Sequence, residues 1–132
     1  MPVTYETNGS VTPQEILTLL AFGGFPRPLN DPDRIQRMLE NGSFYVTARD
    51  EGRLVGFVRC LTDYAYYGLV TEVAVAPSHK GKGVGREMLR LTRETATPKA
   101  TLILTSSAEG LSYYKHLGWE WDARAFRLRR AE

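Results

Sequence analysis

Apolar and polar positions alternate along this chain at two different periods, and each period predicts one kind of secondary structure. Within residues 81–95, apolar residues recur four and then three positions apart at 84, 88 and 91, as on the buried face of a helix. Thr12 and Asp31 each precede a proline, which indicates a capped helix start with proline in the first turn. Helices are therefore predicted at residues 14–20, 32–40, 81–95 and 108–117.

Strands are predicted where β-branched and aromatic residues gather. Residues 43–49 and 53–62 are two such runs, and Asp50-Glu51-Gly52 between them supplies the turn of a hairpin. Gly56 in the second run marks either a bulge or the close approach of another segment. Further strands are expected at residues 3–7, 69–76 and 100–105, with a final pair of strands or one bent strand at residues 119–129.

The order of these elements predicts mixed α/β structure, with a single layer of sheet and helices on both faces. At 132 residues the chain suits one domain over residues 1–132. In the strand at 69–76, Thr71, Val73 and Val75 are expected to share one face, and Glu72 and Ala74 the other.

Composition places the chain among ordinary globular proteins, with 42% apolar and 24% charged residues. No segment approaches the roughly 18 to 20 apolar residues of a membrane span, and the N-terminus lacks the pattern of a signal peptide. We therefore expect a cytoplasmic protein without a membrane partner.

Cysteine and histidine are scarce, which argues against a zinc site or an intrachain disulfide. Cys60 is the one cysteine, and we expect it to be buried in a strand, with a catalytic thiol as the alternative. His79 and His116 are the two histidines. Both are expected at the surface without a catalytic role, and no metal is expected.

The most informative stretch is the run from Lys80 to Arg86, Lys-Gly-Lys-Gly-Val-Gly-Arg, between a predicted strand and a predicted helix. Glycines permit a tight turn, and the free amides of a first helical turn beside cations form an anion site. The spacing fits neither the nucleoside triphosphatase phosphate loop nor the Gly-x-Gly-x-x-Gly dinucleotide motif.

Charge is distributed unevenly around this run. The net charge is +2, but residues 1–78 hold six Lys and Arg against nine Asp and Glu, while residues 79–132 hold eleven against six. The cationic half contains the glycine-rich run, which favours a phosphate-bearing ligand. The basic residues do not form the dense stripe that nucleic acid binding requires, so no nucleic acid partner is expected.

Three ordered pieces resemble the GNAT superfamily of N-acetyltransferases. Lys80, Gly83 and Gly85 are similar to its pyrophosphate loop, Val73-Ala74-Val75-Ala76-Pro77 precedes that loop, and the segment from Tyr113 to Trp119 is similar to its Phe-Tyr-x-x-x-Gly-Phe segment. Lys80 departs from the usual Gln or Arg, and Ser107 stands where many members carry Asn. The resemblance implies a mixed, mostly antiparallel sheet of about six to seven strands with helices on both faces.

The resemblance also implies acetyl-CoA as co-substrate. The strand near Val73 would splay from the strand at 100–105 and leave backbone groups free to pair with pantetheine, and the Val73 amide is the candidate oxyanion donor. The implied cofactor-binding residues are Val73, Ala74, Val75, Lys80, Gly81, Lys82, Gly83, Val84, Gly85, Arg86, Ser107 and Tyr114.

Two residues are catalytic candidates. The resemblance makes Tyr114 the general acid that protonates the CoA sulfur, or a residue that positions the thioester, while Tyr113 is expected to be packed. Glu72 is the candidate base, with a structural carboxylate as the equal alternative. Asp63 is the alternative base, or the anionic anchor for an amine.

For the acceptor, the resemblance favours a small-molecule primary amine. Phe25, Asp63, Tyr64 and Tyr66 are the candidate substrate-binding residues, with the aromatic rings as a wall for the amine. Exposed tyrosines serve equally well as a homodimer contact, and the equal alternative for Phe25 is a residue that closes the core. A protein acetyltransferase with an open peptide groove and a non-catalytic acyl-CoA-binding or partner-binding module are the two alternatives.

Overall fold

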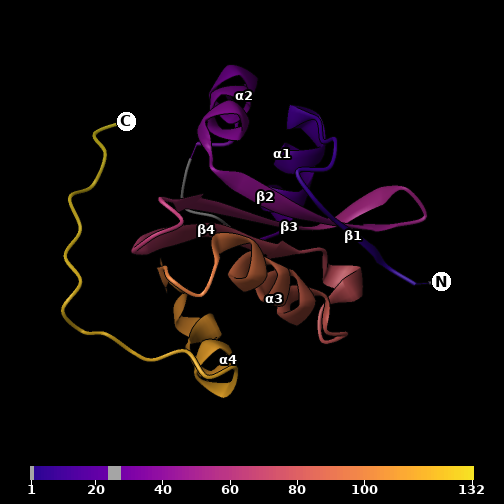
Figure 1. Cartoon of the computed structure of the whole chain (residues 1–132). Helices are drawn as coiled ribbons and strands as arrows, with labels where there is room; N and C mark the ends of the chain where they lie inside the picture. The colour runs from indigo at the N-terminus through magenta and orange to yellow at the C-terminus, as the bar shows by residue number, and fades with distance from the viewer. Residues whose placement is uncertain (1, 24–27) are drawn as a thin grey trace.

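A computed structural model describes residues 2–23 and 28–132 as one sheet with helices against both faces (Figure 1). The described sheet has five strands in the order β1-β2-β3-β4-β5, antiparallel except for the parallel pair β4 and β5. The strands are β1 (Thr4–Thr7), β2 (Phe44–Asp50), β3 (Arg53–Thr62), β4 (Tyr67–Val75) and β5 (Thr101–Leu104). The helices are α1 (Pro13–Phe22), α2 (Pro32–Asn41), α3 (Val84–Ala96) and α4 (Leu111–His116), with short 3-10 turns η1 (Pro77–His79) and η2 (Ala108–Gly110).

The first two helices start as their sequences predict. The side chain of Thr12 accepts a hydrogen bond from the Glu15 amide while Glu15 accepts from the Thr12 amide, which is a capping box. Asp31 caps α2 by accepting from the Arg34 amide. Glu15 also pairs with Arg49 at 2.7 Å and so ties α1 to β2.

Gly56 confirms the expected close approach of another segment. A Cβ atom at Gly56 would lie 2.8 Å from Cε of Met88 and 3.0 Å from Cβ of Ala48, so only glycine lets α3 pack this closely on the hairpin. Met88 is fully buried in the core that the hairpin, α1 and α3 share. Cys60 is buried in β3, as expected.

β4 contains a bulge that the sequence did not reveal. Val58 pairs with Val73 and Cys60 with Val70, so Thr71 and Glu72 together oppose Arg59. Thr71 and Glu72 consequently line the same groove instead of pointing to opposite faces. The expectation that Thr71 shares a face with Val73 was therefore wrong.

The prediction of strands at residues 119–129 was also wrong, and the described sheet has five strands instead of six or seven. Phe126 and Leu128 alternate with arginines as in a strand, but both are 100% exposed. Such a pattern forms a strand only where an edge accepts its hydrogen bonds and a surface buries its apolar face. Among the described residues, no strand pairs with residues 119–129 and no surface buries Phe126 or Leu128.

Candidate functional site

The glycine-rich run forms the loop that leads into α3. Gly81 and Gly83 have φ angles of 74° and 82°, in the left-handed region that glycine tolerates best. Gly83 is the residue before the first turn of α3, so the amides that follow it are free of helical partners. Lys80, Lys82 and Arg86 are exposed around this turn. The free amides and the three cations have the geometry and charge that an anion requires, and phosphate binding at this loop stays a prediction.

His79 lies directly before this loop and is buried, contrary to the expectation that it lies at the surface. It is only 8% exposed, and its Nε2 lies 2.7 Å from Oδ2 of Asp50. Its Nδ1 lies 2.7 Å from the hydroxyl of Ser78. The contact with His79 lowers the pKa of Asp50 below its ordinary value. No local sequence signal joins Asp50 to His79, because their pairing depends on how the hairpin packs beside η1.

β4 and β5 separate halfway along β4. Their pairing runs from Tyr67 and Thr101 to Val70 and Leu104 and ends there. Among the described residues, the part of β4 at 71–75 has β3 on one side and no strand on the other. Val73 and Val75 are half-buried and Ala74 is buried. The backbone along this edge can therefore pair with an extended ligand, as the sequence-based hypothesis requires.

Tyr113 and Tyr114 are neighbours in α4 but have different surroundings. A Cβ at Gly85 would lie 3.1 Å from the hydroxyl of Tyr113, which places that hydroxyl over the loop. The Tyr113 ring packs edge-on against Tyr114, with centroids 5.2 Å apart, but Tyr113 is still 39% exposed, so the expected packing is partial. Tyr114 instead packs edge-on against Trp119, with ring centroids 5.9 Å apart. Burial raises the pKa of Tyr114 to about 12, which keeps its phenol protonated.

Ser107 caps the turn before α4. Its hydroxyl accepts a hydrogen bond from the Gly110 amide at 3.3 Å, and its carbonyl accepts from the Ser106 hydroxyl. The Ser107 side chain thus has a structural partner in its own turn, and its predicted contact with the pantetheine arm stays a prediction.

Glu72 forms a buried ion pair in the bulge of β4. Its side chain is fully buried, and its two oxygens accept hydrogen bonds from Arg59 at 2.9 Å and 3.3 Å. The Thr71 hydroxyl donates to the same carboxylate. A buried carboxylate needs such partners to offset its desolvation. Glu72 can act as a base only if one of these contacts opens, and its catalytic role stays a prediction.

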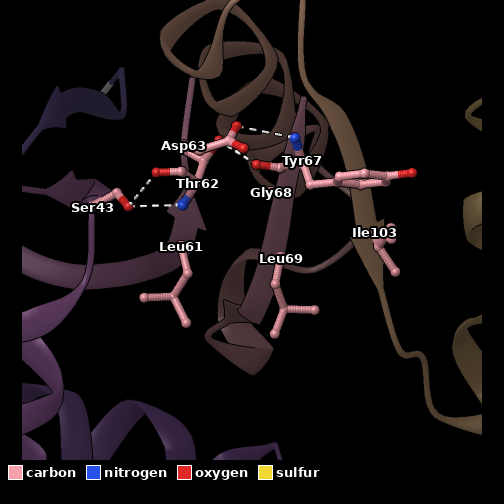
Figure 2. Close-up of a pocket in the computed structure, with 8 residues that line it drawn as sticks. All are labelled: Ser43, Leu61, Thr62, Asp63, Tyr67, Gly68, Leu69 and Ile103. Atoms are coloured by element: carbon pink, nitrogen blue, oxygen red, sulfur yellow. Dashed lines mark hydrogen bonds between the residues drawn. The ribbon is translucent and has the colours of Figure 1, made fainter. Parts of the chain in front are cut away.

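A groove of about 590 Å³ lies beside the point where β4 and β5 separate (Figure 2). Leu61, Leu69 and Ile103 supply its apolar surface, and Ser43, Asp63 and Tyr67 supply polar groups. A second groove of about 330 Å³ shares Leu61 and Leu69 with it and extends to Thr71 and Glu72 under α2. The two grooves adjoin at Leu61 and Leu69, and together they are called the trough below; the second groove is also lined by three arginines, Arg34, Arg59 and Arg130.

Asp63 is held at one end of this trough by its own turn. Its Oδ1 accepts hydrogen bonds from the amides of Ala65, Tyr66 and Tyr67 at 2.8, 2.8 and 3.1 Å. These bonds lower the pKa of Asp63, so it stays ionised at neutral pH. The carboxylate thus keeps a negative charge at the groove, as an amine anchor would require.

The other candidate substrate residues are only partly brought together. Tyr64 packs near Phe44 with ring centroids 6.3 Å apart, and Tyr66 is 74% exposed. Neither lines the groove, whereas the adjacent Tyr67, which was not among the candidates, does. Phe25 lies outside the described residues. Sequence reasoning missed Leu61, Leu69 and Ile103, because their apolar character alone predicts a core position.

The described residues include no helix long and apolar enough to cross a membrane. Within the same residues, no group of three or more His, Cys, Asp or Glu side chains is placed to hold a metal ion.

Comparison with known families gives one clear match. Residues 40–121, from the end of α2 through α4, match the model of the acetyltransferase (GNAT) domain. This range contains the glycine-rich loop, the unpaired edge of β4 and both adjacent tyrosines.

Sequence relatives include enzymes named for different acceptors. Histone acetyltransferase TAP1 of Glycine max is 23% identical over 91% of this chain and 57% of its own length. Serotonin N-acetyltransferase 2 of Oryza sativa is 28% identical over 79% of this chain and 54% of its own length. The chain thus spans a little over half the length of these curated relatives.

A solved structure supports the fold. The crystal structure of a Deinococcus radiodurans R1 protein assigned as an acetyltransferase superposes with a TM-score of 0.80 at 27% identity. The match covers 97% of this chain and 88% of the other.

Proposed function

The chain belongs to the GNAT family of acetyltransferases, and on that premise we propose that it transfers the acetyl group of acetyl-CoA to a small-molecule primary amine. One observation carries the proposal: β4 leads from the trough at its start to the glycine-rich loop with three exposed cations after its end. Its unpaired edge at 71–75 runs between the two. Acetyl transfer requires such an arrangement, because acetyl-CoA and the amine bind at separate sites and the thioester must lie next to the amine nitrogen.

The cofactor half of the site consists of the loop and the edge of β4. The amides at the start of α3, with Lys80, Lys82 and Arg86, would hold the pyrophosphate. Residues 73–75 would pair with the pantetheine arm, and the Val73 amide would donate to the developing oxyanion. Position 80 is lysine, where the family usually has Gln or Arg. Its ammonium group would contact the phosphate as a single point charge, without the two parallel hydrogen bonds of a guanidinium.

The transfer itself requires two proton movements. The amine nitrogen bonds to the acetyl carbon, the carbon–sulfur bond breaks, and the sulfur leaves with the electron pair. Tyr114 is proposed to give the sulfur its proton, and its raised pKa supports a protonated phenol at neutral pH. Glu72 or Asp63 is proposed to take the proton that the amine loses.

The trough supports an amine with an apolar body as acceptor. Its volume lies within the range of small-ligand sites, which is roughly 300 to 1,000 Å³. Leu61, Leu69 and Ile103 would contact the apolar part, and the ionised Asp63 would attract the cationic amine. The serotonin acetyltransferase relative is named for an acceptor of this class, whereas the soybean relative is named for a protein acceptor.

A thiol-release assay with acetyl-CoA tests the proposal. The panel holds arylalkylamines, aliphatic amines, amino sugars and lysine-containing peptides. Turnover with small amines above that with peptides is expected, while a preference for peptides would favour the protein acceptor. Absence of CoA release with every acceptor would refute the acetyltransferase reaction.

Calorimetry tests the cofactor site independently of the acceptor. Lys80→Glu with Lys82→Glu is expected to weaken acetyl-CoA binding at least tenfold. Lys99→Glu, which makes the same charge change at an exposed lysine outside the site, is the matched control. Equal affinity of all three proteins would exclude this loop as the phosphate site.

A further inference from the structure

The two grooves of the trough carry opposite charges. Asp63 is the one charged side chain among the described residues that line the first groove. Arg34, Arg59 and Arg130 line the second groove, with Glu72 as its one described carboxylate, so its lining residues have a net charge of +2. A ligand that fills both grooves therefore meets a negative group in one and a positive surface in the other.

β3 sets the order of these groups along the trough. Side chains two positions apart lie on the same face of an extended strand, and Asp63 directly follows the end of β3. Arg59, Leu61 and Asp63 therefore follow one another in a row. Leu61 is paired with Leu69 of β4, and both leucines line both grooves (Figure 2). An apolar surface thus joins the negative end of the trough to the positive one.

The three arginines come from three separate segments. Arg34 lies on α2, Arg59 on β3 and Arg130 on the C-terminal tail, which runs toward α2 (Figure 1). Arg34 donates to the carbonyl of Glu132 at 3.0 Å, which places the end of the tail beside α2. The Arg59 guanidinium is bonded to the buried Glu72 at 2.9 and 3.3 Å. Arg34 and Arg130 are exposed, so their side chains can reach a ligand in the groove.

The charge of the second groove disfavours a ligand whose only charged group is an ammonium. Like charges that line one groove repel each other and repel a cationic amine. An anionic group between them reverses both effects, and a guanidinium holds a carboxylate or phosphate through two parallel hydrogen bonds. Asp63 and the leucines suit an amine with an apolar body, but these features leave the arginines without a role in acceptor binding.

We propose that the acceptor amine also carries an anionic group, a carboxylate or a phosphate, which Arg34 and Arg130 bind in the second groove. This inference rests on the proposed function and narrows its acceptor to a zwitterion. The apolar body lies on Leu61 and Leu69. The amino group lies toward Asp63 in the first groove, beside the point where β4 and β5 separate.

Calorimetry on the full chain saturated with CoA tests the anion site with matched probes. The compound 4-(2-aminoethyl)benzoate and its methyl ester have the same amine and ring, and they differ in the charge of the carboxyl group. The benzoate is expected to bind about tenfold or more tightly, as charge-assisted hydrogen bonds imply. Tyramine phosphate and tyramine form the second pair, and the pair with the larger ratio identifies the preferred anion. CoA is present so that the phosphate probe does not bind at the glycine-rich loop.

Two double variants locate the preference for the anion. Arg34→Gln with Arg130→Gln is expected to bring the affinity ratio of each pair close to one. Arg37→Gln with Arg127→Gln removes one exposed arginine from α2 and one from the tail that line neither groove, so the ratio is expected to persist. Because each ratio compares two ligands on one protein, partial loss of folded protein does not change it. Equal affinities within both pairs, a preference that survives Arg34→Gln with Arg130→Gln, or no binding of any probe would overturn the inference.

Thiol release with the same four probes separates this inference from acetyl transfer itself. Turnover of the ester and tyramine at least equal to that of their anionic counterparts would overturn the inference and leave acetyl transfer to small amines standing. Selective binding of the anionic probes, without CoA release by these or any other acceptor in the panel, would refute acetyl transfer and leave the anion site standing.

Discussion

His79 Nε2 lies 2.7 Å from Oδ2 of Asp50, and this contact joins the turn before α3 to the β2–β3 hairpin. Asp50 is the last residue of β2, while His79 ends η1 directly before the lysine-glycine loop. The hairpin is part of the rigid core, so the contact fixes where the chain enters the loop. A flexible glycine-rich segment binds an anion best when its first residue is held in place.

Replacing His79 with alanine is therefore expected to weaken acetyl-CoA binding more than it slows the chemical step. We expect the KM for acetyl-CoA to rise about 5- to 30-fold, which corresponds to 1–2 kcal/mol, with kcat changed less than twofold. Steady-state kinetics at saturating amine measure both constants. His116→Ala, at an exposed histidine of α4, is the control. An unchanged KM would show that the loop does not depend on this contact.

The buried pair of Arg59 and Glu72 predicts a strongly non-additive effect on stability. Arg59→Met removes the guanidinium that lies 2.9 Å from the buried Glu72 carboxylate, and Glu72→Leu removes the carboxylate that Arg59 contacts. Each change is expected to lower the free energy of unfolding by about 3–5 kcal/mol. The double substitution is expected to cost less than the larger single one. Urea denaturation of the four proteins measures the coupling, and additive losses would contradict it.

The same carboxylate gives a separate catalytic prediction. Glu72→Gln preserves the shape of the side chain but removes its capacity to take a proton at neutral pH. If Glu72 is the base, the acidic limb of the pH dependence of kcat disappears in the variant and turnover falls about 10²-fold or more. A pH profile parallel to that of the unmodified enzyme would instead identify Glu72 as a structural carboxylate, and Asp63→Asn becomes the next variant to measure.

Local chemistry made part of this molecule predictable. Capping residues with prolines located two helices, and the glycine-rich run located the turn that leads into α3. The hairpin at Asp50-Glu51-Gly52 followed from its turn residues. Each of these features depends on neighbours within a few positions, which the sequence displays directly.

The features that were missed depend on distant segments. The contact of Asp50 with His79 forms only when the hairpin packs against η1, and the bulge at Thr71 becomes visible only in the register with β3. The alternation of Phe126 and Leu128 with arginines is typical of a strand, but it does not show whether a neighbouring strand is available for pairing, and both side chains are fully exposed. Tyr113 and Tyr114 are adjacent, and only the packing of Trp119 against Tyr114 distinguishes them.

These two tyrosines predict different kinetic effects when each loses its hydroxyl. Tyr114→Phe is expected to lower kcat about 10²-fold with little change in acetyl-CoA affinity, because a general acid acts in the chemical step. Tyr113→Phe is expected to raise the KM for acetyl-CoA and preserve kcat, since its hydroxyl lies over the loop beside Gly85. Parallel kinetics of the two variants, with calorimetry for affinity, test both roles. If only Tyr113→Phe lowers kcat, Tyr113 is the acid and Tyr114 is a packing residue.

The ion pair of Glu15 with Arg49 predicts how stability changes with pH. Hydrogen bonds from Arg49 lower the pKa of Glu15 below its ordinary value. A carboxylate with a lowered pKa in the folded state stabilises the protein above its unfolded pKa of about 4.3, and this contribution is lost as the pH falls through the lower folded value. Glu15→Gln keeps a side chain suited to the capping box and removes only the charge.

The difference in unfolding free energy between the unmodified protein and Glu15→Gln should therefore be largest near neutral pH and shrink below about pH 4. Its size is expected to be at most about 1 kcal/mol, because both side chains are partly exposed and water screens the pair. Urea denaturation at pH 7, 5 and 3.5 measures it, with Glu120→Gln at an exposed carboxylate as the control. A difference that stays constant across these pH values would mean that Glu15 contributes through packing and hydrogen bonds, not through its charge.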